Sequence, residues 1–269
     1  MKWITPIALI VFCITMSCSP RNELKPPTNP YDPDNPDYEL PYVTMTSGIE
    51  ENGIININVW TLSWQGNETA YQFSFRLNES DWSSWSTSTM VTYNYLDEGN
   101  YQFDIKARTN QTVPVEGDAN SFHFSVDAVT GPAIRIFPLY QSMSIGEVGE
   151  IEIIAEEVDS LMGAEVHLTF NPSVIQIKSV AYSPFLYDGK EFSISFKEID
   201  NDNGTVKMVV VRASGEKSTV SGTGAIAIIE IETISEGTTD IEINSSVFKD
   251  QDNDLIDVTQ RVNGIIVVK

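Results

Sequence analysis

Cysteine and histidine are almost missing from this chain. Its 269 residues include two cysteines, Cys13 and Cys18, and two histidines, His123 and His167. Because both cysteines lie near the N-terminus, the rest of the chain has no disulfide, thiol nucleophile or cysteine metal site. A lone histidine on a strand is usually solvated, and neither histidine has a second one at metal-ligand spacing. The stability of the folded part must therefore come from burial of its side chains.

Positive charge is also scarce. The chain has 16 Lys and Arg against 38 Asp and Glu, a net charge of -22. Nucleic acid and anionic lipid surfaces repel such a chain, which argues against both as direct partners. The hydrophobic fraction of 41% nevertheless suffices for packed cores and argues against a disordered chain.

The motifs of common enzyme classes are missing as well. The sequence has no G-x-S-x-G, no glycine-rich phosphate loop and no histidine cluster. Its 38 acidic residues offer many carboxylate pairs for glycoside hydrolysis, but none of these pairs stands out. We therefore expect a protein that is not an enzyme.

The apolar run at the N-terminus, Ile7–Ile14, is too short to span a bilayer. It follows one basic residue, Lys2, as in an export signal. The next residues, Thr15 to Cys18, resemble a relaxed bacterial lipobox, with Thr15 where Leu is usual. That resemblance implies a lipid on Cys18 that holds the protein to a membrane, and Ser19 after it favours the outer membrane or cell surface. The alternative is plain signal-peptide cleavage, which releases a soluble secreted protein.

Proline is concentrated in one stretch, with seven prolines between Ser19 and Pro41. Proline excludes helices and sheet ladders there, so the stretch is predicted to be an extended, semi-rigid spacer. From Tyr42 onward the hydrophobic pattern alternates with period two, and no helical period of useful length occurs. In the first region this pattern predicts strands over residues 54–60, 71–77, 90–96, 101–108 and 121–126.

A Thr-Gly-Pro junction at Thr130–Pro132 opens a second region, in which the pattern predicts nine strands. They cover residues 133–139, 150–158, 163–170, 174–182, 191–199, 205–213, 224–234, 239–248 and 263–269. Nine strands exceed the seven of a minimal immunoglobulin-like module and favour a jelly-roll-like sandwich. The chain is thus predicted to be all-β, with two tandem β-sandwiches. The predicted parts are a signal peptide (1–17), a tether (18–41), a first sandwich (42–130) and a second sandwich (131–269).

The first region contains Trp64, the stretch FSFRLNESDWSSWS (Phe73–Ser86) and the stretch LDEGNYQFDIKAR (Leu96–Arg108). In these residues it resembles fibronectin type III-like or Ig-like modules of bacterial surface proteins. Exposed Trp82 and Trp85 would be able to stack on a sugar ring. The alternative is that they are structural tryptophans of a sandwich strand.

In the second region, Ser144–Val180 combine a glycine-bounded turn, an apolar strand and the triplet Phe170-Asn171-Pro172, and Ser221–Ile243 form a later pair of glycine-bounded strands. In these segments the region from about Ala133 to Lys269 resembles a cohesin domain, a family that usually has Tyr-Asp-Pro at the position of the triplet. This resemblance implies that the partner is a dockerin, typically carried by a polysaccharide-degrading enzyme. It also implies that the partner docks on one sheet of the sandwich. Related sandwiches bind cellulose, so direct carbohydrate binding remains the alternative.

Strand parity indicates which side chains face outward. If Val166 and Leu168 face the core, then Glu165, His167 and Thr169 face out from the same strand. By the same rule, Glu230 and Glu232 flank buried isoleucines on a strand that could join that sheet. The resemblance implies roles for four residues. Glu165 falls where the family often has an acid that contacts the partner, and Val209 falls at an apolar contact position. Arg212 falls at a position that is often acidic, and Gly215 falls in a conformationally permissive loop.

One acidic cluster remains, made of Asp250, Asp252, Asp254 and Asp257. Carboxylates spaced in this way can converge on Ca²⁺. Leu255, however, stands where an EF-hand loop needs Gly, and an ordinary turn is the alternative. We expect no cofactor, and Ca²⁺ is the single candidate metal.

The sequence therefore predicts a non-catalytic, lipid-anchored adaptor of the bacterial cell envelope. Its second sandwich is predicted to bind a dockerin-type module linked to polysaccharide degradation. The other readings are a direct carbohydrate-binding module and a spacer without a specific ligand.

Overall fold

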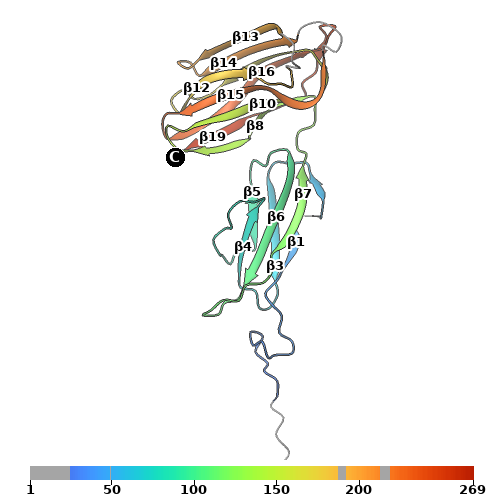
Figure 1. Cartoon of the computed structure of the whole chain (residues 1–269), viewed down its shortest axis with the longest axis vertical. Coiled ribbons are helices and arrows are strands. Elements are labelled where there is room, and N and C mark those ends of the chain that lie inside the picture. Colours follow the sequence, from blue (N-terminus) through green and yellow to red (C-terminus); the bar gives the residue numbers. More distant parts are fainter. Residues whose placement is uncertain (1–24, 49, 187–191, 213–218) are drawn as a thin grey trace, which may run out of the picture. The chain divides into compact units, whose positions relative to one another are not determined.

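The computed structural model describes residues 25–48, 50–186, 192–212 and 219–269. Every regular element in these residues is a β-strand (Figure 1). No helix long and apolar enough to cross a membrane occurs in this part of the chain. The all-β prediction is confirmed.

Residues 25–39 form a small unit of their own. Three successive Asx-Pro steps begin at Asn29, Asp32 and Asn35. In each step the Asx side chain accepts a hydrogen bond from the backbone N–H two residues later. This part of the predicted extended spacer is therefore a series of tight turns, because each Asx side chain replaces a backbone acceptor.

The first sandwich consists of a three-stranded sheet, in the order β1-β3-β5, and a four-stranded sheet, in the order β2-β7-β6-β4. Its strands are β1 (Val43–Ser47), β2 (Gly53–Ile55), β3 (Trp60–Gly66), β4 (Gln72–Leu77), β5 (Met90–Tyr93), β6 (Gly99–Arg108) and β7 (Asn120–Val126). The predicted strand over residues 54–60 is divided between β2 and β3. β1 and most of β3 were not predicted.

The core of the first sandwich is aromatic. Trp64 is 2% exposed and packs against Phe73, Phe75 and Phe103, with ring centroids 5.4–6.1 Å apart. Offset and edge-on aromatic pairs of this kind stabilise a core beyond simple burial. In the sequence, Trp64 was noted only as part of the resemblance to fibronectin type III-like modules, whereas in the structure it is the centre of this core.

The second sandwich pairs a five-stranded sheet, β12-β15-β10-β8-β18, with a seven-stranded one. The main path of the larger sheet is β13-β14-β11-β16-β19-β9, and β17 pairs with β16. The strands are β8 (Ala133–Phe137), β9 (Tyr140–Met143), β10 (Val148–Leu161), β11 (Gly163–Thr169), β12 (Ile175–Tyr182), β13 (Phe192–Asp200), β14 (Thr205–Arg212), β15 (Val220–Thr233), β16 (Gly237–Lys249), β17 (Leu255–Ile256), β18 (Gln260–Val262) and β19 (Gly264–Val268).

All nine strands predicted in this region are present, and three short ones join them. The core between the two sheets is mainly aliphatic, with Ile153, Ile229 and Val166 wholly buried. Burying a side chain of this size stabilises the fold by about 1.5–3 kcal/mol. Strand parity is therefore strongly fixed, because a slip of one residue would turn these side chains outward.

Candidate functional site

The outward side of four adjacent strands in the larger sheet, β13, β14, β11 and β16, is the candidate site and is called the docking face below. Cross-strand pairing arranges its side chains in rows. One row runs Phe196, Val209, Glu165 and Val247. Directly opposite residues of adjacent strands point to the same side of a sheet, so each row is continuous.

Five hydrophobic side chains on this face form what is called the apolar patch: Ile194, Phe196, Val209, Val211 and Val247. Ile194 is 52% exposed, Phe196 44% and Val247 37%, whereas the other two are half-buried. Exposed hydrophobic side chains that adjoin on a sheet are typical of an interaction site.

A polar row borders the apolar patch on one side. Glu198, Lys207, His167 and Ser245 pair across the same four strands. The result is an apolar centre with a polar rim, the usual anatomy of a protein-binding surface.

Glu165 joins the patch to this row. Its Oε1 accepts a hydrogen bond of 2.8 Å from His167 Nε2 and lies 3.5 Å from Lys207 Nζ. The carboxylate can only accept, so the Nε2 of His167 carries the proton. These contacts, the His167 hydrogen bond first, hold the pKa of Glu165 below its ordinary value of 4.5. Glu165 is therefore a fixed negative charge beside two valines.

The opposite sheet holds the edge of the docking face in place. Tyr182 of β12 points its hydroxyl at the backbone carbonyls of Phe196 and Val209, the latter at 2.9 Å. Lys197 donates from its amine to the Val180 carbonyl of the same opposite sheet. β13 pairs only with β14 among the described strands, so these bonds fix an edge that would otherwise rest on one neighbour.

Among the predicted partner-binding residues, the structure places four on this face. Glu165, His167 and Thr169 point outward from β11, and Val209 points outward from β14. Gly215 lies outside the described residues, as does the predicted lipidation residue Cys18.

Arg212 was predicted to contact the partner, and this placement is wrong. Its side chain is 4% exposed, and Nη1 donates to the Leu186 carbonyl at 2.8 Å. Val206, Met208 and Val210 point inward, so alternation along β14 turns Arg212 inward too. The guanidinium is buried because backbone carbonyls accept its hydrogen bonds.

Glu230 and Glu232 were also misplaced. They lie on β15, which belongs to the five-stranded sheet, on the other side of the sandwich core. There Glu232 pairs with Lys178 at 2.7 Å, and Glu230 accepts from Ser179 at 3.2 Å. Both side chains face outward as predicted, but they do so from the five-stranded sheet and not from the sheet that carries Glu165.

Three residues of the acidic cluster, Asp250, Asp252 and Asp254, lie in the turn between β16 and β17, and Asp257 follows β17. Asp250 Oδ1 accepts hydrogen bonds from the backbone N–H groups of Asp252 and Asp254, at 2.9 and 2.8 Å. No group of three or more potential metal ligands gathers anywhere in the described residues. The observed arrangement is a side-chain-capped turn, and binding of Ca²⁺ by Asp257 and its neighbours stays untested.

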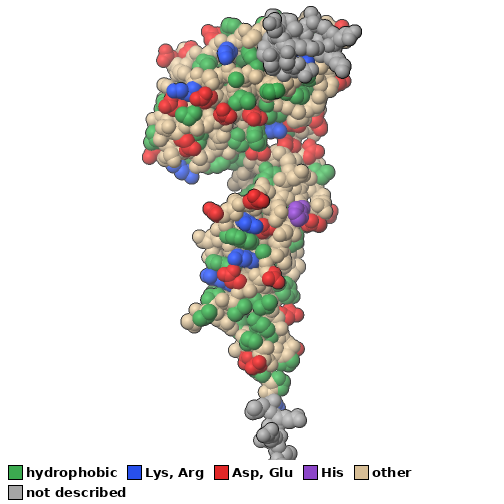
Figure 2. All heavy atoms as spheres, in the orientation of Figure 1, with side chains coloured by type: hydrophobic (Ala, Val, Ile, Leu, Met, Phe, Trp, Pro, Cys, Tyr) green, Lys and Arg blue, Asp and Glu red, His purple; other side chains and the backbone are tan. Residues whose placement is uncertain are grey.

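Trp82 and Trp85 of the first sandwich stack with three cations and form what is called the tryptophan ladder. Arg76 and Lys106 lie 4.8 and 4.9 Å from the centre of Trp82, and Lys106 and Arg108 lie 5.2 and 4.5 Å from that of Trp85. The cations come from successive outward positions of β4 and β6, so the rings lie between them. Figure 2 shows Lys and Arg spaced along the first sandwich with hydrophobic side chains between them. Neither ring has both faces free for a sugar.

Sequence reasoning missed most of the apolar patch. Ile194 and Phe196 lie on a strand that was predicted, but its pairing with β14 was not. Val247 faces outward because of a bulge in β16, where Asn244 has no partner across from β11. An extra residue reverses the parity of the strand beyond it.

Comparison with known proteins finds similarity over about half of the chain. No family model matches, and no curated protein matches. Similar folds occur among solved structures of cohesins. A non-cellulosomal cohesin from Archaeoglobus fulgidus has 12% identity and a TM-score of 0.43, over 51% of this chain and 90% of its own.

The sixth cohesin of scaffoldin B from Acetivibrio cellulolyticus, solved in complex with a Cel5 dockerin, has 16% identity and a TM-score of 0.45. The match covers 52% of this chain and 100% of that one. A type II cohesin from the cellulosome of the same organism has 17% identity and a TM-score of 0.44, over 50% and 94%. The sandwich described above is defined by its own strand order and core, independently of these similarities.

Proposed function

We propose that this protein is a non-catalytic adaptor of the bacterial cell envelope whose second sandwich binds a dockerin-type module. The observation that carries the proposal is the apolar patch with its polar rim, on the strands that bear Glu165 and Val209. The cohesin-like sequence of this region names the class of partner. That partner would typically be attached to a polysaccharide-degrading enzyme, and the adaptor would hold the enzyme at the cell.

The composition of the docking face suits a protein partner, because a standard interface has an apolar centre. The apolar patch lies on adjacent strands, and the Tyr182 hydroxyl bonds to the Phe196 carbonyl of the edge strand before any partner binds. A surface that is already ordered loses little entropy on association.

Direct binding of carbohydrate is the second candidate. It would use exposed aromatic rings in a row, but each of the two tryptophans best suited by sequence already contacts two cations in the tryptophan ladder. Among the residues whose side chains the structure describes, Phe196 is the one Phe, Tyr or Trp on the docking face, which is not enough for a row. Protein binding is therefore the better supported of the two.

The test measures binding of the chain from residue 19 onward to dockerin modules encoded in the same genome, by biolayer interferometry. Glu165→Arg with Val209→Asp should abolish binding. The matched control is Glu230→Arg with Ile228→Asp, the same changes on the outward side of β15, which should bind like the wild type. Binding to insoluble polysaccharide but to no dockerin would overturn the proposal.

Anchoring is a separate part of the proposal and has its own test. In the source bacterium, the wild-type protein should enter the detergent phase of a Triton X-114 extraction, and Cys18→Ser should shift it to the aqueous phase. A single lipid chain binds membranes weakly, so the multiply acylated N-terminus of a lipoprotein is what would give stable anchoring. An unchanged distribution would contradict the lipid anchor and leave docking unaffected.

A further inference from the structure

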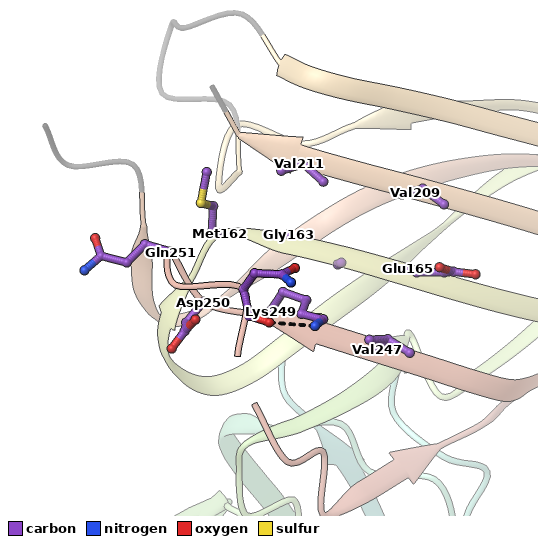
Figure 3. Close-up of a pocket in the computed structure, with 11 residues that line it drawn as sticks. Met162, Gly163, Glu165, Val209, Val211, Val247, Lys249, Asp250 and Gln251 are labelled. Atoms are coloured by element: carbon purple, nitrogen blue, oxygen red, sulfur yellow. Dashed lines mark hydrogen bonds between the residues drawn. The ribbon is translucent and has the colours of Figure 1, made fainter. Parts of the chain in front are cut away.

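A hollow of about 270 Å³ lies in the docking face where β11 begins and β16 ends. Figure 3 shows Val209 and Val211 on one side of Gly163 and Val247 and Lys249 on the other. The turn after β16 closes the end of the hollow. An engineered apolar cavity of about 150 Å³ binds benzene, so this hollow has room for one large side chain.

Gly163 is one of the residues that line the hollow. It occupies an outward position in the row that contains Val211 and Lys249, where the neighbouring strands each contribute a side chain. A Cβ at this position would lie 3.1 Å from Val211 Cγ2, which is tighter than normal contact. The absence of a side chain therefore lets Val211 pack closely over the start of β11, beside the hollow.

The charged side chains that line the hollow are Glu165, Asp250 and Lys249, a formal charge of 1 − 2 = −1. Lys249 donates from its amine to the Asn253 carbonyl of the turn after β16, at 2.6 Å. Asp252 and Asp254 lie in the same turn, exposed to solvent and outside the lining. This excess of negative charge attracts a cationic group on a partner and repels an anionic one.

We propose that this hollow is the anchor subsite of the docking face and takes one bulky apolar side chain of the partner, such as Leu or Met, with Lys or Arg beside it. This inference takes the docking face from the proposed function and adds what the partner must present there. Side chains that enter such apolar pockets provide most of the binding free energy of an interface, whereas rim charges mainly select the partner.

The test uses the chain from residue 19 onward, which holds every described strand, and a defined probe, N-acetyl-Leu-Lys-amide. In an NMR titration the probe should shift the amide signals of Gly163, Val211 and Val247 and saturate with a roughly millimolar Kd. The same peptide with Ser in place of Leu should cause no saturable shift. The peptide with Glu in place of Lys should bind at least threefold more weakly at low salt.

Two matched variants test the position of the subsite. Val247→Trp should fill the hollow and weaken the probe at least tenfold. Val148→Trp, an equally large change at an exposed valine of the other sheet, should leave the Kd unchanged. The proposal is overturned if the Leu-Lys probe shifts none of the three signals, if Val247→Trp binds it normally, or if the Leu-Glu peptide binds equally well.

The same variants distinguish this inference from the proposed function. A dockerin that binds the wild type and Val247→Trp equally would overturn the anchor subsite and leave the docking role standing. Binding of the Leu-Lys probe without binding of any dockerin would overturn the docking role, while the hollow would still select an apolar side chain next to a basic one.

Discussion

Two surfaces of this protein carry half-exposed hydrophobic side chains, and they differ in what covers them. In the tryptophan ladder, each indole has a cation from β4 or β6 within about 5 Å of its ring centre. On the docking face, Phe196 and Val247 project among other hydrophobic side chains, and the charged groups lie along one edge.

The ladder also protects a sheet edge. The Trp82–Ser86 segment bonds to the edge strand β4, where Ser83 O and Oγ contact Ser74 and Phe75 and Ser86 exchanges backbone bonds with Phe73. A bare edge strand is a site for unwanted pairing, and this segment closes it. The comparison shows that hydrophobic side chains of similar exposure differ in whether charged neighbours already contact them.

The largest effect expected from this comparison is on partner binding. Phe196→Asp puts a charge into the apolar patch at an edge position, so it should weaken a dockerin that binds the wild type by about 30- to 1,000-fold, or roughly 2–4 kcal/mol. Biolayer interferometry measures it. Trp85→Ala in the tryptophan ladder is the comparison variant and should change affinity less than twofold. Equal losses in the two variants would mean that the two surfaces do not differ in function.

The next effect is on folding and concerns a cation that neither surface exposes. Arg212→Met leaves the buried Leu186 carbonyl without its donor, which should lower the free energy of unfolding by about 2–3 kcal/mol. Urea unfolding measures the change. Lys207→Met removes a cation that is 42% exposed on the docking face and should cost less than about 0.5 kcal/mol. An Arg212→Met variant that is as stable as the wild type but no longer binds a dockerin would show that Arg212 contacts the partner after all.

Strand parity carried most of what the sequence could predict. It placed all nine main strands of the second sandwich and the outward row of β11. For Arg212, parity along β14 alone gives the correct inward position. The resemblance to a family position overrode this parity. Local alternation was the better guide there because the packing of Met208 and Val210 fixes the strand.

The rest depends on pairing between distant segments. Glu230 and Glu232 were assigned to the wrong sheet because the residue pattern of a strand does not show which strands will lie beside it. Val247 was missed because the bulge at Asn244 reverses which side chains of β16 face outward, and the bulge is defined by the pairing of β16 with β11. To predict the hollow at Gly163, one would need both the pairing of β11 with β14 and β16 and the position of the bulge in β16.

A smaller effect should follow from opening the tryptophan ladder. Trp82→Ala removes two cation–π contacts, each worth about 0.5–1 kcal/mol, so the free energy of unfolding should fall by about 1–2 kcal/mol. Urea unfolding again measures it, with Ser84→Ala in the same segment as the control that should change little. Retention of the protein on insoluble polysaccharide should stay the same. A loss of retention without a loss of stability would make Trp82 a sugar-binding residue.

The smallest effect tests the charge on the docking face. The pKa of Glu165 lies below 4.5 because His167 donates a hydrogen bond to it. A carboxyl with a lowered pKa in the folded state stabilises the fold above its unfolded pKa. This contribution is lost as the pH falls through the folded pKa. Since Glu165 is 40% exposed, the contribution should be below about 0.5 kcal/mol, so a direct titration is the sharper measurement.

NMR titration of the Glu165 side-chain carboxyl should therefore give a pKa below 4.5 in the wild type, and His167→Leu should raise it toward 4.5. His167→Gln, whose amide can still donate, should raise it less. Lys207→Met should also raise it, but by less than His167→Leu, since Lys207 Nζ is 3.5 Å away and the His167 hydrogen bond is 2.8 Å long. If Lys207→Met had the larger effect, the charge of Glu165 would be set by ion pairing. Added salt would then lower the affinity for the partner much more than expected for a docking face that binds mainly through its apolar patch.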